Sequence, residues 1–159
     1  MKGNVNIISA LNRLLANELS AIDQYFIHAE LYLDMGLNKL HEHSTHESAH
    51  EKLHATELIQ RILFLEGQPD LETRDTLLVG STVEEMLHND LTVEYKVADM
   101  LRETMALCER EQDFGTRRML GVLLEDTEMD HAYFLERQLS LIKLIGVENY
   151  MQSQMAAQA

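Results

Sequence analysis

The chain has little of several residue types, and each shortage excludes a class of protein. It has one cysteine, Cys108, among 159 residues, which excludes an internal disulfide framework and any four-cysteine zinc or iron–sulfur site within one chain. No stretch of about 18 apolar residues is free of charge, so no membrane-spanning helix is expected. The N-terminal residues lack the pattern of a secretory signal. With a lone cysteine typical of a reducing compartment, we expect a cytoplasmic protein with no membrane partner.

Basic residues are scarce as well. Lys and Arg together number 13, against 27 for Asp and Glu, which gives a formal net charge of −14. Nucleic-acid binding depends on cationic contacts to phosphate, so such an acidic chain is not expected to bind nucleic acid. The excess of carboxylates suits cation binding and the steering of positive ligands.

One proline and seven glycines leave long stretches without helix breakers. In these stretches Leu, Ile, Ala and Met recur at three- and four-residue spacing, which is typical of amphipathic helices. The pattern predicts an all-α protein with a single domain over residues 1–159 and a short fifth helix after Gly146. The four long helices are predicted at residues 5–34, 38–65, 82–111 and 114–144.

The connections between these helices predict their arrangement. Short turns join the first helix to the second and the third to the fourth, which favours antiparallel neighbours. The segment 66–81 is long enough to run along the bundle, so the second and third helices are expected to be parallel. This is the ferritin-like four-helix bundle with a long crossover. Ser81 or Thr82, with Glu84 or Glu85, predicts the N-terminal cap of the third helix.

Carboxylates interrupt the apolar faces of the predicted helices. Glu18 lies in the middle of the apolar face of the first helix, and Glu94 lies in that of the third. A lone buried carboxylate costs several kcal/mol and favours uptake of a proton. Two such groups at mid-bundle need a shared compensating charge, which a metal ion supplies. The alternative is that both carboxylates face solvent or a contact between subunits.

Glu-x-x-His pairs on the second and fourth helices complete this pattern. Glu51/His54 and Glu128/His131 each place a carboxylate and an imidazole on one side of a helix, one turn apart. Carboxylate and imidazole ligands suit iron or manganese, and two divalent ions could share Glu51 and Glu128 as bridges. A single pair is weak evidence. One Glu from each of two helices and one pair from each of the others is the arrangement of di-iron and di-manganese bundles.

Two further pairs have the same spacing. Glu85/His88 lies beside the apolar face of the third helix and is interpreted as a solvated surface pair. Glu47/His50 lies one turn before the second-helix pair. It is either surface or, together with His46, an auxiliary iron site on a cavity wall.

Nearly the whole chain resembles the bacterioferritin family. The resemblance is carried by the segments LNRLLANELSAIDQYFIHAEL, THESAHEKLHA, RILFLEGQPDL, EEMLHNDLTVEY and GVENYMQSQ. It implies a hollow 24-subunit shell that oxidises Fe(II) with oxygen or hydrogen peroxide and stores ferric mineral. It also implies a di-iron ferroxidase centre formed by Glu18, Glu51, His54, Glu94, Glu128 and His131.

Two details of the resemblance concern this centre. The family carries a tyrosine at the position of Tyr25, close to the di-iron site, as an electron donor; a core tyrosine bonded to a metal ligand is the alternative. The fourth-helix pair, Glu128/His131, comes one residue later than is usual in the family. This predicts a one-residue insertion between Glu94 and Glu128, near the corner between the third and fourth helices.

The haem site of the family is altered in this chain. Bacterioferritins bind haem b between two-fold related subunits through a methionine that directly follows the Glu of the second-helix pair, and Lys52 stands there. We therefore expect that this chain alone does not bind haem in that way. The resemblance implies either a homo-oligomer or a mixed shell with a haem-binding bacterioferritin subunit. In a mixed shell, that haem would receive electrons from a bacterioferritin-associated ferredoxin.

Other functions fit the sequence less well. A structural shell subunit with little activity of its own is one alternative, and the presence of all six ligand residues argues against it. A DNA-protecting mini-ferritin is another, but that type builds its iron site between subunits, and the basic tail that many members use is absent. A peroxidase of the rubrerythrin type needs a Cys-x-x-Cys module, which a single cysteine excludes.

Overall fold

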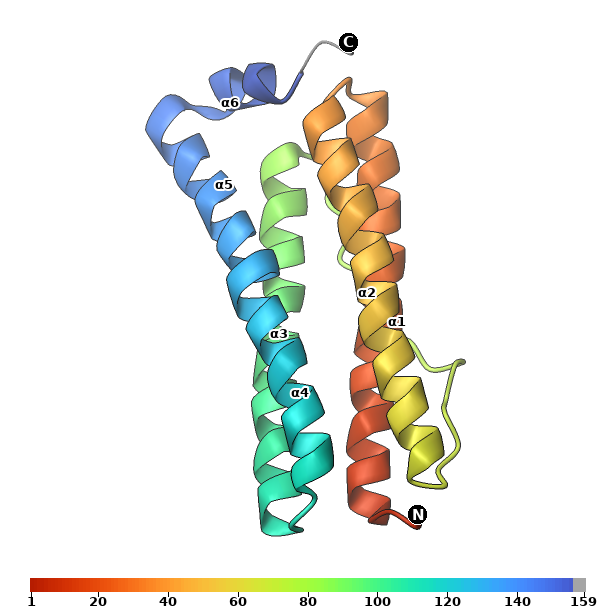
Figure 1. Cartoon of the computed structure of the whole chain (residues 1–159). Helices are drawn as coiled ribbons and strands as arrows, with labels where there is room; N and C mark the ends of the chain where they lie inside the picture. The colour runs from red at the N-terminus through yellow and green to blue at the C-terminus, as the bar shows by residue number, and fades with distance from the viewer. Residues whose placement is uncertain (156–159) are drawn as a thin grey trace.

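The computed structural model describes residues 1–155, in which four long helical rods stand side by side and a short helix crosses one end (Figure 1). No strand occurs within this described range, so the prediction of an all-α bundle is confirmed. The helices are α1 (Val5–Asp34), α2 (Asn38–Phe64), α3 (Val83–Arg110), α4 (Phe114–Asp126), the π-helix η1 (Thr127–Ala132), α5 (Tyr133–Ile145) and α6 (Val147–Gln154).

The rods form two antiparallel pairs. One pair is α1 and α2; the other is α3 and the continuous rod α4–η1–α5 (Figure 1). Gly36, in the turn between α1 and α2, has a φ of 78°, which glycine adopts without the penalty of a Cβ. The crossover, residues 65–82, runs the length of the bundle, so α2 and α3 are parallel (Figure 1). The predicted ferritin-like connectivity is therefore confirmed.

Polar side chains of α1 hold the crossover by its backbone. They recur every four residues and so form one stripe along the helix. Each accepts a hydrogen bond from a backbone N–H of the crossover: Ser20 Oγ from Asp75 (2.7 Å), Gln24 Oε1 from Leu78 (2.9 Å) and His28 Nε2 from Gly80 (3.1 Å). The crossover has no helix or strand to pair its backbone groups, and this stripe supplies acceptors for them.

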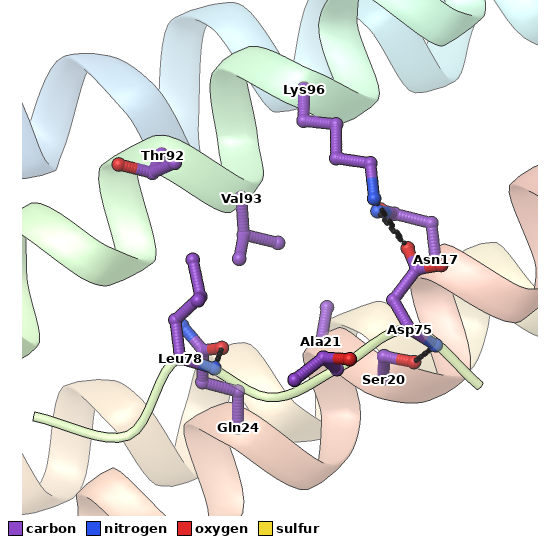
Figure 2. Close-up of a pocket in the computed structure, with 10 residues that line it drawn as sticks. Asn17, Ser20, Ala21, Gln24, Asp75, Leu78, Thr92, Val93 and Lys96 are labelled. Atoms are coloured by element: carbon purple, nitrogen blue, oxygen red, sulfur yellow. Dashed lines mark hydrogen bonds and ion pairs between the residues drawn. The ribbon is translucent and has the colours of Figure 1, made fainter.

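A cavity of 360 Å³ lies between α1, the crossover and α3 (Figure 2). At one end of it, Asp75 Oδ2 accepts hydrogen bonds from Asn17 Nδ2 at 3.0 Å and from Lys96 Nζ at 2.9 Å (Figure 2). Asp75 thereby ties the crossover to both helices.

The predicted cap of the third helix is present at the end of the crossover. Thr82 Oγ1 accepts a hydrogen bond from the N–H of Glu85 at 3.2 Å, and the Glu85 carboxylate accepts one from the N–H of Thr82 at 3.3 Å. These reciprocal bonds form a capping box. The cap at Thr82 is confirmed, and it fixes where the crossover ends and α3 begins.

The apolar core has two parts, separated by a band of buried polar residues at mid-bundle. Members of the part nearer the N-terminus include Leu14, Leu58, Leu101 and Leu120. Members of the other part include Tyr32, Leu40, Leu87 and Leu135. Within residues 1–155, no helix has both the length and the apolar character needed to cross a membrane.

Candidate metal centre

Three carboxylates and two imidazoles meet in the polar band between the two parts of the core. They come from all four rods and are at most 3% exposed: Glu18 from α1, Glu51 and His54 from α2, Glu94 from α3 and His131 from η1. These are five of the six residues that the sequence assigns to a metal site.

Glu51 lies between the two imidazoles. Its Oε2 is 3.0 Å from His54 Nδ1, and its Oε1 is 2.9 Å from His131 Nδ1. Glu18 Oε1 lies 3.9 Å from His54 Nδ1, and Glu94 Oε2 lies 3.4 Å from His131 Nδ1. The ligand atoms thus form two triads that share Glu51, and within each triad they lie within 4.8 Å of one another. This arrangement suits two divalent ions bridged by Glu51.

Burial changes the proton affinities of these groups. Burial, followed by the charge of Glu51, raises the pKa of Glu18 well above its ordinary value, and the same causes raise the pKa of Glu94. Burial also opposes ionisation of Glu51, but hydrogen bonds from His131 and His54 outweigh it and lower the pKa of Glu51. Burial disfavours the charged form of His131, yet hydrogen bonds to Glu51 and Glu94 outweigh that effect and raise its pKa to about 12. Protons thus balance the buried negative charge in the metal-free protein.

Several buried polar atoms in and beside this group make no well-aligned hydrogen bond among the described residues, although some of them lie close to an oppositely charged group. They are Glu18 Oε1, Glu94 Oε2, Glu47 Oε2 and His131 Nδ1. Buried polar atoms are nearly always paired in folded proteins, and coordination of a cation would satisfy those that face the triads. Carboxylate oxygens with imidazole nitrogens are ligands for iron, manganese and zinc. The residues present therefore fit a pair of divalent ions.

Tyr25 adjoins this group. Its hydroxyl donates a hydrogen bond of 2.5 Å to Glu94 Oε1. Burial and the charge of Glu94 raise the pKa of Tyr25 well above its ordinary value, so the phenol stays protonated and remains a donor. The contact with a ligand residue agrees with both roles considered for Tyr25, and its role as an electron donor stays a prediction.

The sixth expected ligand, Glu128, lies apart from the other five. Its side chain is 44% exposed and forms an ion pair with Arg102 of α3. A Glu-x-x-His pair shares one side only in an α-helix, and η1 instead has i→i+5 hydrogen bonds, which take up one more residue per turn. The π-helical register takes up one extra residue within Thr127–Ala132, whereas the insertion expected near the corner between α3 and α4 stays a prediction. This register turns Glu128 away from the side of His131.

Part of the predicted auxiliary set adjoins the centre. Glu47 is buried, and its Oε2 lies 3.0 Å from His131 Nε2. His50 Nδ1 lies 2.9 Å from the same nitrogen. His46 is exposed, with its ring centroid 6.1 Å from that of His50, and it belongs to none of the ligand groups found among the described residues.

Asp126 is a residue of the site that the sequence analysis missed. Its Oδ2 accepts a hydrogen bond from His54 Nε2 at 3.4 Å, and it forms a ligand group with His50 and His54. The signal in the sequence was a carboxylate five residues before His131. That spacing has meaning only when the helix between the two residues is a π-helix.

Comparison with known proteins agrees with this geometry. Residues 8–145 match the ferritin family, described as a ferritin-like domain. A bacterial ferritin of Synechocystis sp. is 53% identical over 156 residues, which cover 98% of this chain and 100% of that protein. The chain belongs to the bacterioferritins of the ferritin-like superfamily. A bacterial ferritin of Pseudomonas aeruginosa is 49% identical (97% and 99% covered), and a bacterioferritin of Mycobacterium avium is 37% identical (94% of each).

Lys52 is exposed in this chain. It stands at the position where the resemblance to bacterioferritins implies a haem-ligand methionine. Lys52 follows the buried Glu51 on α2. The apolar side chains of Leu53 on α2 and Phe26 on α1 are 61% and 62% exposed. The α1–α2 pair of this bacterioferritin chain therefore exposes Lys52 as well as large apolar side chains.

Proposed function

We propose that this chain is a ferroxidase subunit of an iron-storage shell. It would bind Fe(II) as substrate at the five buried ligands, oxidise it to Fe(III), and release it into a hollow interior as ferric mineral. The observation that supports this most is the pair of triads sharing Glu51, with several buried ligand atoms that make no well-aligned hydrogen bond among the described residues.

Each residue has a role in this proposal. Glu18 and His54 hold one ion, Glu94 and His131 hold the other, and Glu51 bridges them. Each Fe(II) gives up one electron, and oxygen or hydrogen peroxide accepts the electrons and takes up protons.

Two side roles belong to the same proposal. Tyr25, bonded to Glu94, is the proposed electron donor. Glu47 and His50 form the proposed auxiliary iron site, with His46 at its exposed side.

The test is the rate of aerobic Fe(II) oxidation, followed by the absorbance of the ferric product. Glu18→Ala and His131→Ala each remove one ligand, and we expect each to slow oxidation by at least about tenfold. His88→Ala is the matched control, because His88 belongs to an exposed Glu-x-x-His pair on α3 and should keep the parental rate. Parental rates in both ligand variants would contradict the proposal.

One observation favours a second candidate function, a structural shell subunit with little activity of its own. Glu128 pairs with Arg102, so the two triads contain three carboxylates rather than four. Slow oxidation by the parental protein despite two bound divalent ions per chain would favour this second function. By contrast, all five ligands come from one chain, unlike the intersubunit site expected of a DNA-protecting mini-ferritin.

The assembly is proposed as a 24-subunit shell, either of this chain alone or shared with a haem-binding subunit that a ferredoxin reduces. Support comes from exposed apolar side chains such as Phe26, Leu53 and Leu144, because large exposed apolar areas are typical of contact surfaces. The proposed compartment is the cytoplasm, in keeping with the free thiol of Cys108. Light scattering that shows a stable monomer at micromolar concentration would contradict the shell.

A further inference from the structure

The register of η1 determines which side chains of this segment face the centre. With i→i+5 hydrogen bonds, residues four and five positions before His131 share its side of the helix. These residues are Thr127 and Asp126. Thr127 is buried, and its hydroxyl donates to the backbone carbonyl of Leu123 at 2.8 Å, so it takes up the inward position without offering a carboxylate.

The two imidazoles of the centre are held in the same way. In each ring, Nδ1 faces the carboxylates of the triads and Nε2 faces a carboxylate outside them. For His54, Nδ1 lies 3.0 Å from Glu51 and Nε2 lies 3.4 Å from Asp126. For His131, Nδ1 lies 2.9 Å from Glu51, and Nε2 lies 3.0 Å from Glu47 and 2.9 Å from His50 Nδ1.

A neutral imidazole carries its proton on one nitrogen and a lone pair on the other. A carboxylate that accepts the Nε2–H bond therefore fixes the tautomer in which Nδ1 presents its lone pair to a metal, and it also fixes the orientation of the ring. Asp126 meets this requirement for His54. The carboxylate of Glu128 forms an ion pair with Arg102 and contacts neither imidazole.

We propose that Asp126 is a positioning residue for His54. The π-helical register of η1 turns Asp126 toward His54 and turns Glu128 away from the metal centre, so Glu128 is not a ligand. The proposal rests on the metal centre of the proposed function. It changes the expected donor set, because two divalent ions would meet three carboxylates and keep one net positive charge. A fourth carboxylate would cancel that charge.

The probe is Co(II), titrated without oxygen into the metal-free full-length protein. Calorimetry gives the number of sites and their affinities, and the visible d–d absorption reports the geometry around each ion. Asp126→Ala should weaken one of the two Co(II) sites by roughly 10- to 100-fold, the range for loss of an outer-sphere partner, and change its visible band. Asp126→Asn keeps an acceptor oxygen for Nε2–H, so it should fall between Asp126→Ala and the parent.

Two controls separate this role from a general effect of charge. Glu125→Gln removes a carboxylate from the exposed position next to Asp126 and should keep both affinities within about twofold. Glu128→Gln should likewise keep both Co(II) affinities within about twofold. Weakened Co(II) binding in Glu128→Gln with parental binding in Asp126→Ala would overturn the proposal, because Glu128 would then be the ligand.

Deletion of Thr127 tests the register directly. It removes the extra residue and moves Glu128 into the inward position that Thr127 occupies, so η1 should become α-helical and the centre should gain a carboxylate. We expect Co(II) to bind more tightly than in the parent. Equal or weaker binding would contradict the proposal that the π-helical register keeps Glu128 out of the centre. Failure of the metal centre itself has a different signature: Glu18→Ala and His131→Ala would then leave both Co(II) sites intact.

Discussion

The Tyr25 hydroxyl donates a hydrogen bond of 2.5 Å to Oε1 of Glu94, and both side chains are almost completely buried. Tyr25→Phe removes this donor and leaves a buried carboxylate oxygen short of a partner. We expect the metal-free protein to lose about 1–3 kcal/mol of stability, seen as a lower thermal midpoint in the presence of a chelator.

Tyr32→Phe is the matched control for that change. Tyr32 is equally buried, but its hydroxyl has no hydrogen-bond partner among residues 1–155. Its replacement should therefore leave the midpoint close to the parental value. Equal losses in the two variants would mean that the bond to Glu94 contributes nothing specific.

The crossover should show an acid-dependent contribution from Asp75. Burial opposes ionisation of this carboxyl, but hydrogen bonds from Lys96 and Asn17 outweigh it and lower the pKa of Asp75. A lowered pKa gives stability that is present above the unfolded value, about pH 4, and is lost as the pH falls through the folded value. Asp75→Asn should cost about 1 kcal/mol at pH 7.

Thermal midpoints at pH 7 and pH 3 measure this effect. The difference in thermal midpoint between the parent and Asp75→Asn should be clear at pH 7 and smaller at pH 3, because protonation of Asp75 removes the same charge that the substitution removes. Glu72→Gln is the control, because Glu72 is an exposed carboxylate on the same crossover. A difference that is constant with pH would show that the lost stability does not come from the ionised form of Asp75.

The capping box at the start of α3 should contribute measurably to stability. Thr82→Ala removes the hydroxyl that accepts the N–H of Glu85, and such changes cost about 1 kcal/mol. Thr92→Ala makes the same substitution in the middle of α3, where the hydroxyl donates only to the carbonyl of His88. Chemical denaturation should show a loss in the first variant and little or none in the second.

The arrangement of the bundle followed from sequence because apolar periodicity and connection lengths are local signals. The predicted helix 5–34 matches α1, and the long segment 66–81 predicted the crossover. Two residues of the candidate metal centre, Glu18 and Glu94, were also recognisable because a charged residue in an apolar stripe breaks an otherwise regular pattern.

The position of Glu128 could not be predicted in the same way. The spacing from Glu128 to His131 indicates one shared side only if the helix is α, and the late position of this pair in the resemblance to bacterioferritins did not show where the extra residue lies. The inward placement of Thr127 and the ion pair between Glu128 and Arg102 depend on packing against α3. Asp126 was missed for the same physical reason.

Lys52 should prevent this chain from binding haem through paired methionines. In a two-fold site, one substitution acts twice, so Lys52 would replace both axial ligands and add two positive charges. A lysine ammonium group has three donors and offers no lone pair to iron. We therefore expect the purified chain, reconstituted with haem, to form no stoichiometric low-spin complex.

The optical spectrum after reconstitution is the measurement. Lys52→Met should create a low-spin complex of one haem per two chains with a sulfur–iron charge-transfer band, because it restores both axial ligands at once. Leu53→Met is the control: it adds a methionine at the neighbouring exposed position, about 100° further round the helix, and should not create the complex. The same band in the unmodified chain would refute the prediction, since the axial sulfur would then have to come from a methionine elsewhere in the chain.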